Sequence, residues 1–340
     1  TEDDLIKVID YMHNRYPRLL WASFEDKVFL APRNRRAMYE YFFDELSMIP
    51  DEKQFLVIDS TNNTPIGVLD EVFVAEYGDP GRKFIFRGSL WKIREIIGDR
   101  IYVVPDSDPT GAIPSWVGEE IPVPYEVAQE VGWIRGYVEE RLKNGADISQ
   151  IINELTDRYP CNKDTMERAI KEVIEQVNKG LPVPTDKKVL IEKWEDFFII
   201  HVHLGTLANR ALGRLIADQV ADIVGHAVAV QQDPYRIVIR ASKLLSPIEI
   251  ENVIKILVNK NLDAEVIRMA ERSGLFKRRL VHVARRFGAL AKWADISTMS
   301  LRRLIEMFKD SVIYEEALKE YLTKDIDVEV VKKFLEKIKN

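Results

Sequence analysis

The chain has a single cysteine, Cys161, among its 340 residues, so it cannot form an internal disulfide. It also lacks any apolar run near the roughly 20 residues that a membrane-spanning helix needs, and no signal-peptide pattern opens it. Hydrophobic residues nevertheless make up 46% of the sequence and charged residues 31%. We therefore expect a folded cytoplasmic protein in a reducing compartment, without a membrane partner and with more than one core.

Motifs for catalysis are also missing. The sequence contains no G-x-x-x-x-G-K-[ST] loop, the backbone cradle and lysine that hold nucleotide phosphates. The pair Asp70 and Glu71 resembles a metal-binding acidic box, but without that loop we interpret it as a strand-end pair with turn or capping roles. His201 and His203 alternate on one predicted strand, and a zinc site needs more ligands than these two provide. We expect no catalytic residue and no metal site.

The net charge of −6 excludes a uniformly basic nucleic-acid binder. Positive charge is concentrated instead in two segments of the sequence. Residues 82–100 carry six cations against two acids, and residues 268–286 carry seven against one. Local clusters of this kind are what phosphate contacts require.

The hydrophobic pattern changes several times along the first half of the chain. Residues 2–16 have helical periodicity, and residues 18–32 form an extended, wing-like pair with a turn at Glu25 and Asp26. Short runs rich in Val, Ile, Phe and Tyr between residues 54 and 124 predict an antiparallel barrel or sandwich. Two further segments are predicted to be helical, residues 34–46 and, with breaks near Asn144 and Tyr159, residues 125–179.

The second half begins with the proline-containing segment 180–188, which is the best candidate for a linker. Strands and helices alternate after it, and helices continue to the end of the chain. The class is therefore α+β. The expected strands are 189–190, 197–203, 227–231 and 236–241, and the first expected helices are 208–224 and 247–259.

Four ordered motifs lie between Gly67 and Glu119. They read G-x-L-D-E-x-x-V from Gly67, F-x-G-x-x-W-x-I from Phe86, I-x-V-x-P from Ile101 and P-x-W-x-G-E from Pro114. Together they resemble the β-barrel of the large-helicase-related (Lhr) superfamily-two helicases. Residues 192–213, with Glu192, Trp194, Asp196, Ile200, His201, Gly205, Asn209, Leu212 and Gly213, resemble the DEAD/H-associated domain, as do residues 273–288 and 314–327.

The resemblance implies the C-terminal part of an ATP-dependent helicase. The expected order is the end of a winged-helix module (1–52), a small antiparallel β-barrel (53–124), a helical connector (125–180) and a DEAD/H-associated α+β domain with a helical C-terminal tail (181–340). The family translocates on single strands, unwinds DNA or RNA:DNA duplexes and acts in DNA repair. ATP and Mg²⁺ would be bound by motor domains outside this chain, which is expected to be a monomer with no cofactor of its own.

The first candidate contacts lie on the predicted barrel. Alternation along a strand places Trp91 on one face and Lys92 and Arg94 on the other, with Arg87 at the preceding turn. The resemblance implies that Trp91 stacks on a base of the tracked strand, while a core tryptophan packed beside Ile93 is the alternative. Trp116 is a weaker candidate that more readily caps the barrel.

The other candidates lie on helices. Arg210 and Arg214 are four residues apart and could hold a phosphate near a helix N-terminus, or Arg214 could pair with Asp218. In the second basic segment, the apolar positions leave a cationic helix face that suits contacts to a phosphate backbone. That face would present Arg278, Arg279, Arg285 and Arg286.

Two other functions are compatible with the sequence. The barrel and the helical tail could dock a repair or RNA-processing protein, with the arginines meeting acidic surfaces. A metal-dependent hydrolase built on His201 and His203 is a more distant alternative. Substitution of Trp91 would impair stacking on a strand but not docking through a distant face.

Overall fold

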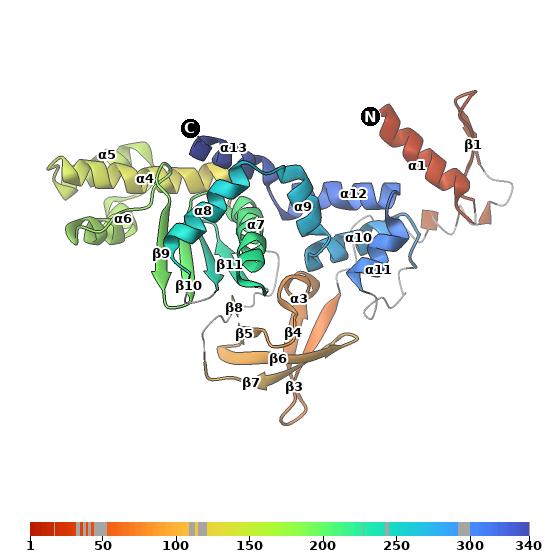
Figure 1. Ribbon diagram of the computed structural model, residues 1–340, viewed down its shortest axis with the longest axis horizontal. Helices are drawn as coiled ribbons and strands as arrows, with labels where there is room; N and C mark the ends of the chain where they lie inside the picture. Colours follow the sequence, from red (N-terminus) through yellow and green to blue (C-terminus); the bar gives the residue numbers. More distant parts are fainter. Residues whose placement is uncertain are drawn as a thin grey trace. The chain divides into compact units, whose positions relative to one another are not determined.

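The computed structural model describes residues 1–16, 18–31, 35–36, 39, 42–43, 53–108, 113–114, 121–226, 228–241, 245–291 and 300–339. The chain divides into two compact units. The first unit comprises residues 1–120 and 270–321, and the second comprises residues 121–269 and 322–340. Figure 1 shows the elements of both. Most of the predicted helix 34–46, Trp116 and most of the P-x-W-x-G-E motif lie outside the described residues.

The first unit opens with helix α1 (Glu2–Asn14) and the antiparallel hairpin of β1 (Trp21–Ser23) and β2 (Val28–Leu30). A capping box at Thr1 and Asp4 starts the helix by satisfying its first backbone N–H groups. The predicted helix and wing-like pair are thus confirmed, including the turn at Glu25 and Asp26. Their assignment to a winged-helix module stays a prediction.

A curled sheet of six strands, called the barrel below, follows the N-terminal helix and hairpin in the sequence of the first unit. Its order is β4-β3-β7-β6-β5-β8, and the helix α3 (Glu71–Tyr77) follows β4. The sheet is mixed, because β3 pairs parallel with β7 and β5 pairs parallel with β8. The strands are β3 (Gln54–Asp59), β4 (Thr64–Asp70), β5 (Lys83–Phe86), β6 (Ser89–Ile97), β7 (Arg100–Pro105) and β8 (Ile113–Pro114).

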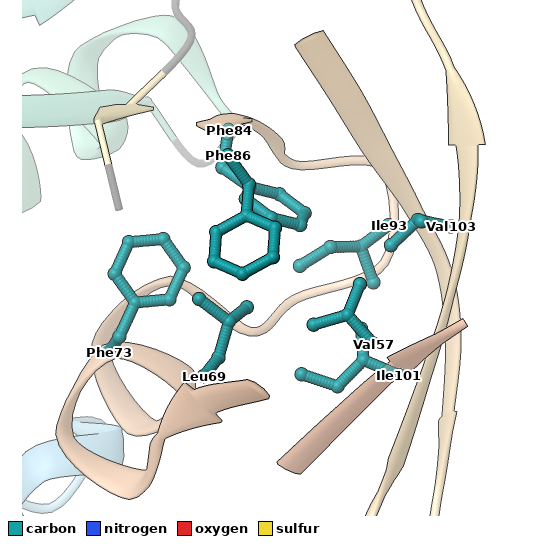
Figure 2. Packing of buried hydrophobic residues seen from close by; sticks show 8 residues of the cluster. All are labelled: Val57, Leu69, Phe73, Phe84, Phe86, Ile93, Ile101 and Val103. Atoms are coloured by element: carbon teal, nitrogen blue, oxygen red, sulfur yellow. The ribbon is translucent and has the colours of Figure 1, made fainter. Parts of the chain in front are cut away.

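The barrel has a compact aromatic and aliphatic core (Figure 2). Phe73 projects from α3 toward Phe84, and their ring centroids are 5.9 Å apart. Burial of such large apolar side chains is the main stabilising contribution to a domain of this size. The core contains Val57, Leu69, Phe73, Phe84, Phe86, Ile93, Ile101 and Val103.

The remainder of the first unit is helical. It consists of α10 (Gly274–Arg286), α11 (Leu301–Phe308) and α12 (Val312–Glu320). Phe276, Leu280 and Val283 of α10 are buried, as the spacing of apolar residues predicts. Helix α10 contacts both α3 and α12, so it lies between the barrel and the rest of the helices of this unit.

The second unit begins with the predicted helical connector. Its helices are α4 (Tyr125–Lys143), α5 (Ile148–Arg158) and α6 (Lys163–Asn178), with breaks at Asn144 and Tyr159 as expected. The segment 180–188 is irregular, but it is not a loose tether. Val183 is fully buried in the core of these three helices, and the carbonyl of Pro184 accepts a hydrogen bond from Arg135.

An antiparallel four-stranded sheet of order β11-β12-β10-β9 follows. One face is buried through Phe198, Ile200, Ile237 and Ile239, where α7 contacts β11 and β12 and α8 contacts β9. The elements are β9 (Leu190–Trp194), β10 (Phe197–His201), α7 (Thr206–Val224), β11 (Ala229–Asp233), β12 (Arg236–Arg240), α8 (Pro247–Val258), α9 (Leu262–Ala270), the π-helix η1 (Tyr321–Asp325), which spans the boundary of the two units, and α13 (Val328–Lys339).

The predicted α+β class is confirmed. In the described part of the chain, no helix is long and apolar enough to cross a membrane. The expected domain boundaries at residues 52, 124 and 180 stay predictions. The two compact units each combine separate segments of the chain and do not test these boundaries.

Candidate nucleic-acid interface

The cations of the first basic segment lie on and around strand β6 of the barrel. A two-residue turn at Arg87 and Gly88, both with positive φ, joins β5 to β6, and this turn suits the twist of a hairpin. Lys92 and Arg94 follow on β6 with exposed side chains, and Ile93 between them is buried. A register shift between Ile93 and Glu95 places Arg94 at a bulge, a common means of redirecting a side chain.

These cations have few acidic partners in the described residues. Arg94 lies 4.0 Å from Glu95, and both side chains are more than half exposed, so this pair is weak. Arg87 lies over the ring of Phe86, 5.8 Å from its centroid. No ion pair of Lys92 or Arg87 is found within the described ranges. Lys83 differs, because it pairs with Asp106 and Asp108.

Trp91 lies on the opposite face of β6 from Lys92. It is half-buried and packs against the barrel core, paired in register with Phe84 of β5. Its indole N–H is buried without a hydrogen-bond partner among the described residues. The packing expected of a core tryptophan is thus observed, and stacking on a base stays a prediction that requires access from the core side.

The arginines of the second basic segment have structural roles. The side chain of Arg279 is 11% exposed and that of Glu320, its partner on α12, is 9% exposed. Arg286 pairs with the same carboxylate. Arg285 is half-buried and makes further interactions. Part of the expected cationic face of α10 is therefore engaged in ion pairs within the unit. Strand binding by these arginines stays a prediction.

A second carboxylate contacts neighbouring positions of α10. Glu71, at the start of α3, lies 2.9 Å from Nε2 of His282 and 3.6 Å from Nε of Arg278. Burial opposes ionisation of Glu71, but the hydrogen bond from His282 and the charges of His282 and Arg278 outweigh it, and its pKa lies below the usual value. Asp70 occupies the N-cap position of α3 without a side-chain capping bond.

Arg210 and Arg214 belong to a helix that is buried on most sides. Arg210 is 9% exposed and donates a hydrogen bond to the carbonyl of Asp325. Thr206 at the start of α7 exchanges hydrogen bonds with the backbone of Val123, so the helix N-terminus is already covered. Arg210 is thus used in packing within the unit, and phosphate binding by Arg210 and Arg214 stays a prediction.

The histidines are used in packing and hydrogen bonding. His201 lies 3.3 Å from Glu192. His203 is buried, and burial together with the positive charge of Arg135 lowers its pKa to about 4, so it is neutral at physiological pH. Among the described residues, no group of three or more His, Cys, Asp or Glu side chains is arranged to hold a metal ion.

The fold and the sequence define the class of the second half of the chain. Residues 183–340 match the family model described as DEAD/H associated. The motifs around Trp194 and Asn209 that suggested this domain therefore identified it correctly.

The similarity to Lhr helicases extends over the whole chain. The ATP-dependent helicase Lhr-Core of Methanocaldococcus jannaschii is 27% identical, over 100% of this chain and 40% of its own length. That of Saccharolobus solfataricus is 27% identical over 92% of this chain and 37% of its own length. The resemblance to Lhr-type helicases is thus confirmed, and the chain spans about two fifths of these relatives.

A solved structure has the same fold. The Mycobacterium smegmatis helicase Lhr bound to ssDNA and AMP-PNP superposes with a TM-score of 0.62 over 99% of this chain and 40% of that protein. Sequence identity in this alignment is 16%, so the match establishes the fold alone.

Proposed function

We propose that this chain is the C-terminal nucleic-acid-binding region of an ATP-dependent DNA helicase that translocates on single strands. The observation that carries the proposal is the row of exposed cations on and before β6, Arg87, Lys92 and Arg94. In the other arginine-rich segment, Arg278, Arg279 and Arg286 are instead engaged in ion pairs within the unit. The relatives named as helicases, and the ssDNA in the similar structure, support it.

In this proposal the barrel holds the strand while a motor moves it. Lys92 and Arg94 contact phosphates, which positions the strand without reading its sequence. Trp91 stacks on a base. Because Trp91 and the cations lie on opposite faces of β6, substitutions can measure their contributions to binding affinity separately. The chain acts as a monomer on single-stranded or tailed DNA, or on an RNA:DNA hybrid, in the cytoplasm during DNA repair.

Hydrolysis of ATP is assigned to motor domains outside this chain. The sequence has no phosphate-binding loop of the G-x-x-x-x-G-K-[ST] form, so its residues do not fit a nucleotide triphosphate and its Mg²⁺. We therefore propose no catalytic step for the chain itself.

The test is fluorescence-anisotropy titration of single-stranded, duplex and three-prime-tailed DNA at several salt concentrations. Binding that prefers single-stranded and tailed DNA and weakens with salt is expected. Trp91→Ala should lose about 1 to 3 kcal/mol if the indole stacks on one base, whereas Trp91→Phe retains an aromatic face. Thermal unfolding of each variant separates lost contact from lost packing. Absence of binding at low salt would contradict the proposal.

A docking function is the second candidate. The observation that favours it is the apolar hairpin β1–β2, on which Trp21, Phe29 and Leu30 are 42%, 61% and 57% exposed. Exposed apolar clusters of this kind occur at protein interaction sites. Replacement of Phe29 and Leu30 by serine would abolish docking and leave binding to single-stranded DNA unchanged.

A further inference from the structure

Glu71 is not among the proposed strand contacts, yet its side chain has several partners in the first unit. Its carboxylate accepts hydrogen bonds from Nε2 of His282 and from the backbone N–H of Lys53, which precedes β3, and it lies 3.6 Å from Nε of Arg278. The contacts therefore come from two directions, the barrel and α10. His282 is 3% exposed, so its hydrogen bond to Glu71 is shielded from solvent.

The backbones of α3 and α10 also touch beside this cluster. A Cβ atom built on Gly274, the first residue of α10, would lie 1.9 Å from the carbonyl oxygen of Ala75. Only glycine permits this approach without a backbone shift. Two separate contacts, one ionic and one steric, thus join the two helices.

Helix α3 also contacts the barrel core, and the end of α10 contacts the N-terminal part of the unit. Phe73 of α3 enters the barrel core against Phe84, and Phe84 pairs in register with Trp91 of β6. The far end of α10 is held by Arg15, whose guanidinium donates to the carbonyls of Phe287 and Gly288. The contact between α3 and α10 therefore links the barrel to the N-terminal part of the unit.

We propose that Glu71 is a positioning residue, which with His282 and Arg278 forms an ionic joint that fixes the barrel on α10. The joint keeps the cations of β6 in one place relative to the helices of the unit before a strand arrives. A binding surface that is already ordered in the free protein loses less conformational entropy when the strand binds. This inference rests on the proposed function.

The joint can be measured without nucleic acid. Spin labels are placed at Asp99→Cys in the β6–β7 turn and at Met307→Cys on α11, both exposed, in a Cys161→Ser background. Double electron–electron resonance then gives the distance between the barrel and the helices. We expect one narrow distribution in the parent protein, a broad one in Glu71→Ala and an intermediate one in Glu71→Gln, which keeps a hydrogen-bond acceptor but not the charge.

Binding of single-stranded DNA is measured on the same variants. The account predicts a loss of about fivefold or more in affinity for Glu71→Ala, the lower end of typical couplings between separate sites, and a partial recovery for Glu71→Gln. Glu315→Gln is the matched control, because it breaks the exposed Lys7 pair between α1 and α12 and should change neither quantity. Near-ultraviolet circular dichroism of Glu71→Gln confirms that the barrel is folded.

Three outcomes would overturn the inference or its foundation. A narrow, unchanged distribution in both Glu71 variants would exclude the joint. A broad distribution with unchanged affinity would exclude its positioning role. If the parent protein shows a narrow distribution but binds no strand, the proposed function is wrong while the joint itself stands.

Discussion

The two basic segments of the chain are both rich in cations, but their side chains differ in exposure and in ion pairing. In residues 82–100, Lys92 and Arg94 stay exposed on the barrel with little neutralisation. In residues 268–286, Arg278, Arg279 and Arg286 of α10 form ion pairs with Glu71 or Glu320. The denser cluster is thus the structural one. Local charge identifies a binding surface only when the acidic residues that fold against it are also known.

The first prediction tests the contrast between the two basic segments by removing the ion pairs of α10 with Glu320. Glu320→Ala leaves Arg279 and Arg286 without their carboxylate in a mostly buried setting, and loss of one partner of a buried pair costs about 3 to 5 kcal/mol. Urea unfolding should show this loss. In the matched control Glu315→Ala, which breaks an exposed pair on the same helix, no resolvable change is expected. Equal stability of the two variants would mean that the α10 arginines are not structural.

A second prediction tests the close packing that accompanies the paired arginines. Gly274→Ala introduces a methyl group against the Ala75 carbonyl, and overpacking of this kind costs about 1 to 3 kcal/mol. Gly136→Ala in α4 is the same substitution where the nearest atom is a Thr185 methyl at 3.3 Å, a contact that a shift of a few tenths of an ångström can relieve, so it should cost less than Gly274→Ala. Thermal unfolding distinguishes them, and an unaffected Gly274→Ala would contradict the described approach of α3 and α10.

The third and smallest effect is on pH dependence. The folded state holds the Glu71 carboxylate with a pKa below its usual value of 4.5, so the unfolded state binds more protons as pH falls through that range. The stabilisation is therefore complete above about pH 4.5 and is lost as pH falls toward the lowered value. Glu71→Gln should be less stable than the parent at pH 6, and the difference should shrink on acidification. A difference independent of pH would contradict an ionised Glu71.

Much of the fold is accessible from sequence because it follows local rules. The helix breaks at Asn144 and Tyr159, the wing-like pair and the alternation around Ile93 are all confirmed. The parallel pairing of β3 with β7 was not predicted, because parallel neighbours need not be adjacent in sequence.

The functional assignments depend more strongly on tertiary contacts. Nothing in the sequence near Arg279 indicates that Glu320, distant along the chain, will neutralise it. The role of Glu71 was missed for the same reason, since its partner His282 lies in the other half of the chain. The available signal was the acidic pair at the end of β4, and its partners could not be identified without the fold.

The most direct test of the central claim is the salt dependence of single-stranded DNA binding by Lys92→Ala/Arg94→Ala. Each phosphate contact contributes about 0.7 to the slope of log affinity against log salt for single strands, so the double variant should lose roughly 1.4. Arg168→Ala/Lys171→Ala, which removes two exposed cations of α6, should leave the slope unchanged. An equal slope for the parent protein and the barrel variant would show that strand β6 is not the binding surface.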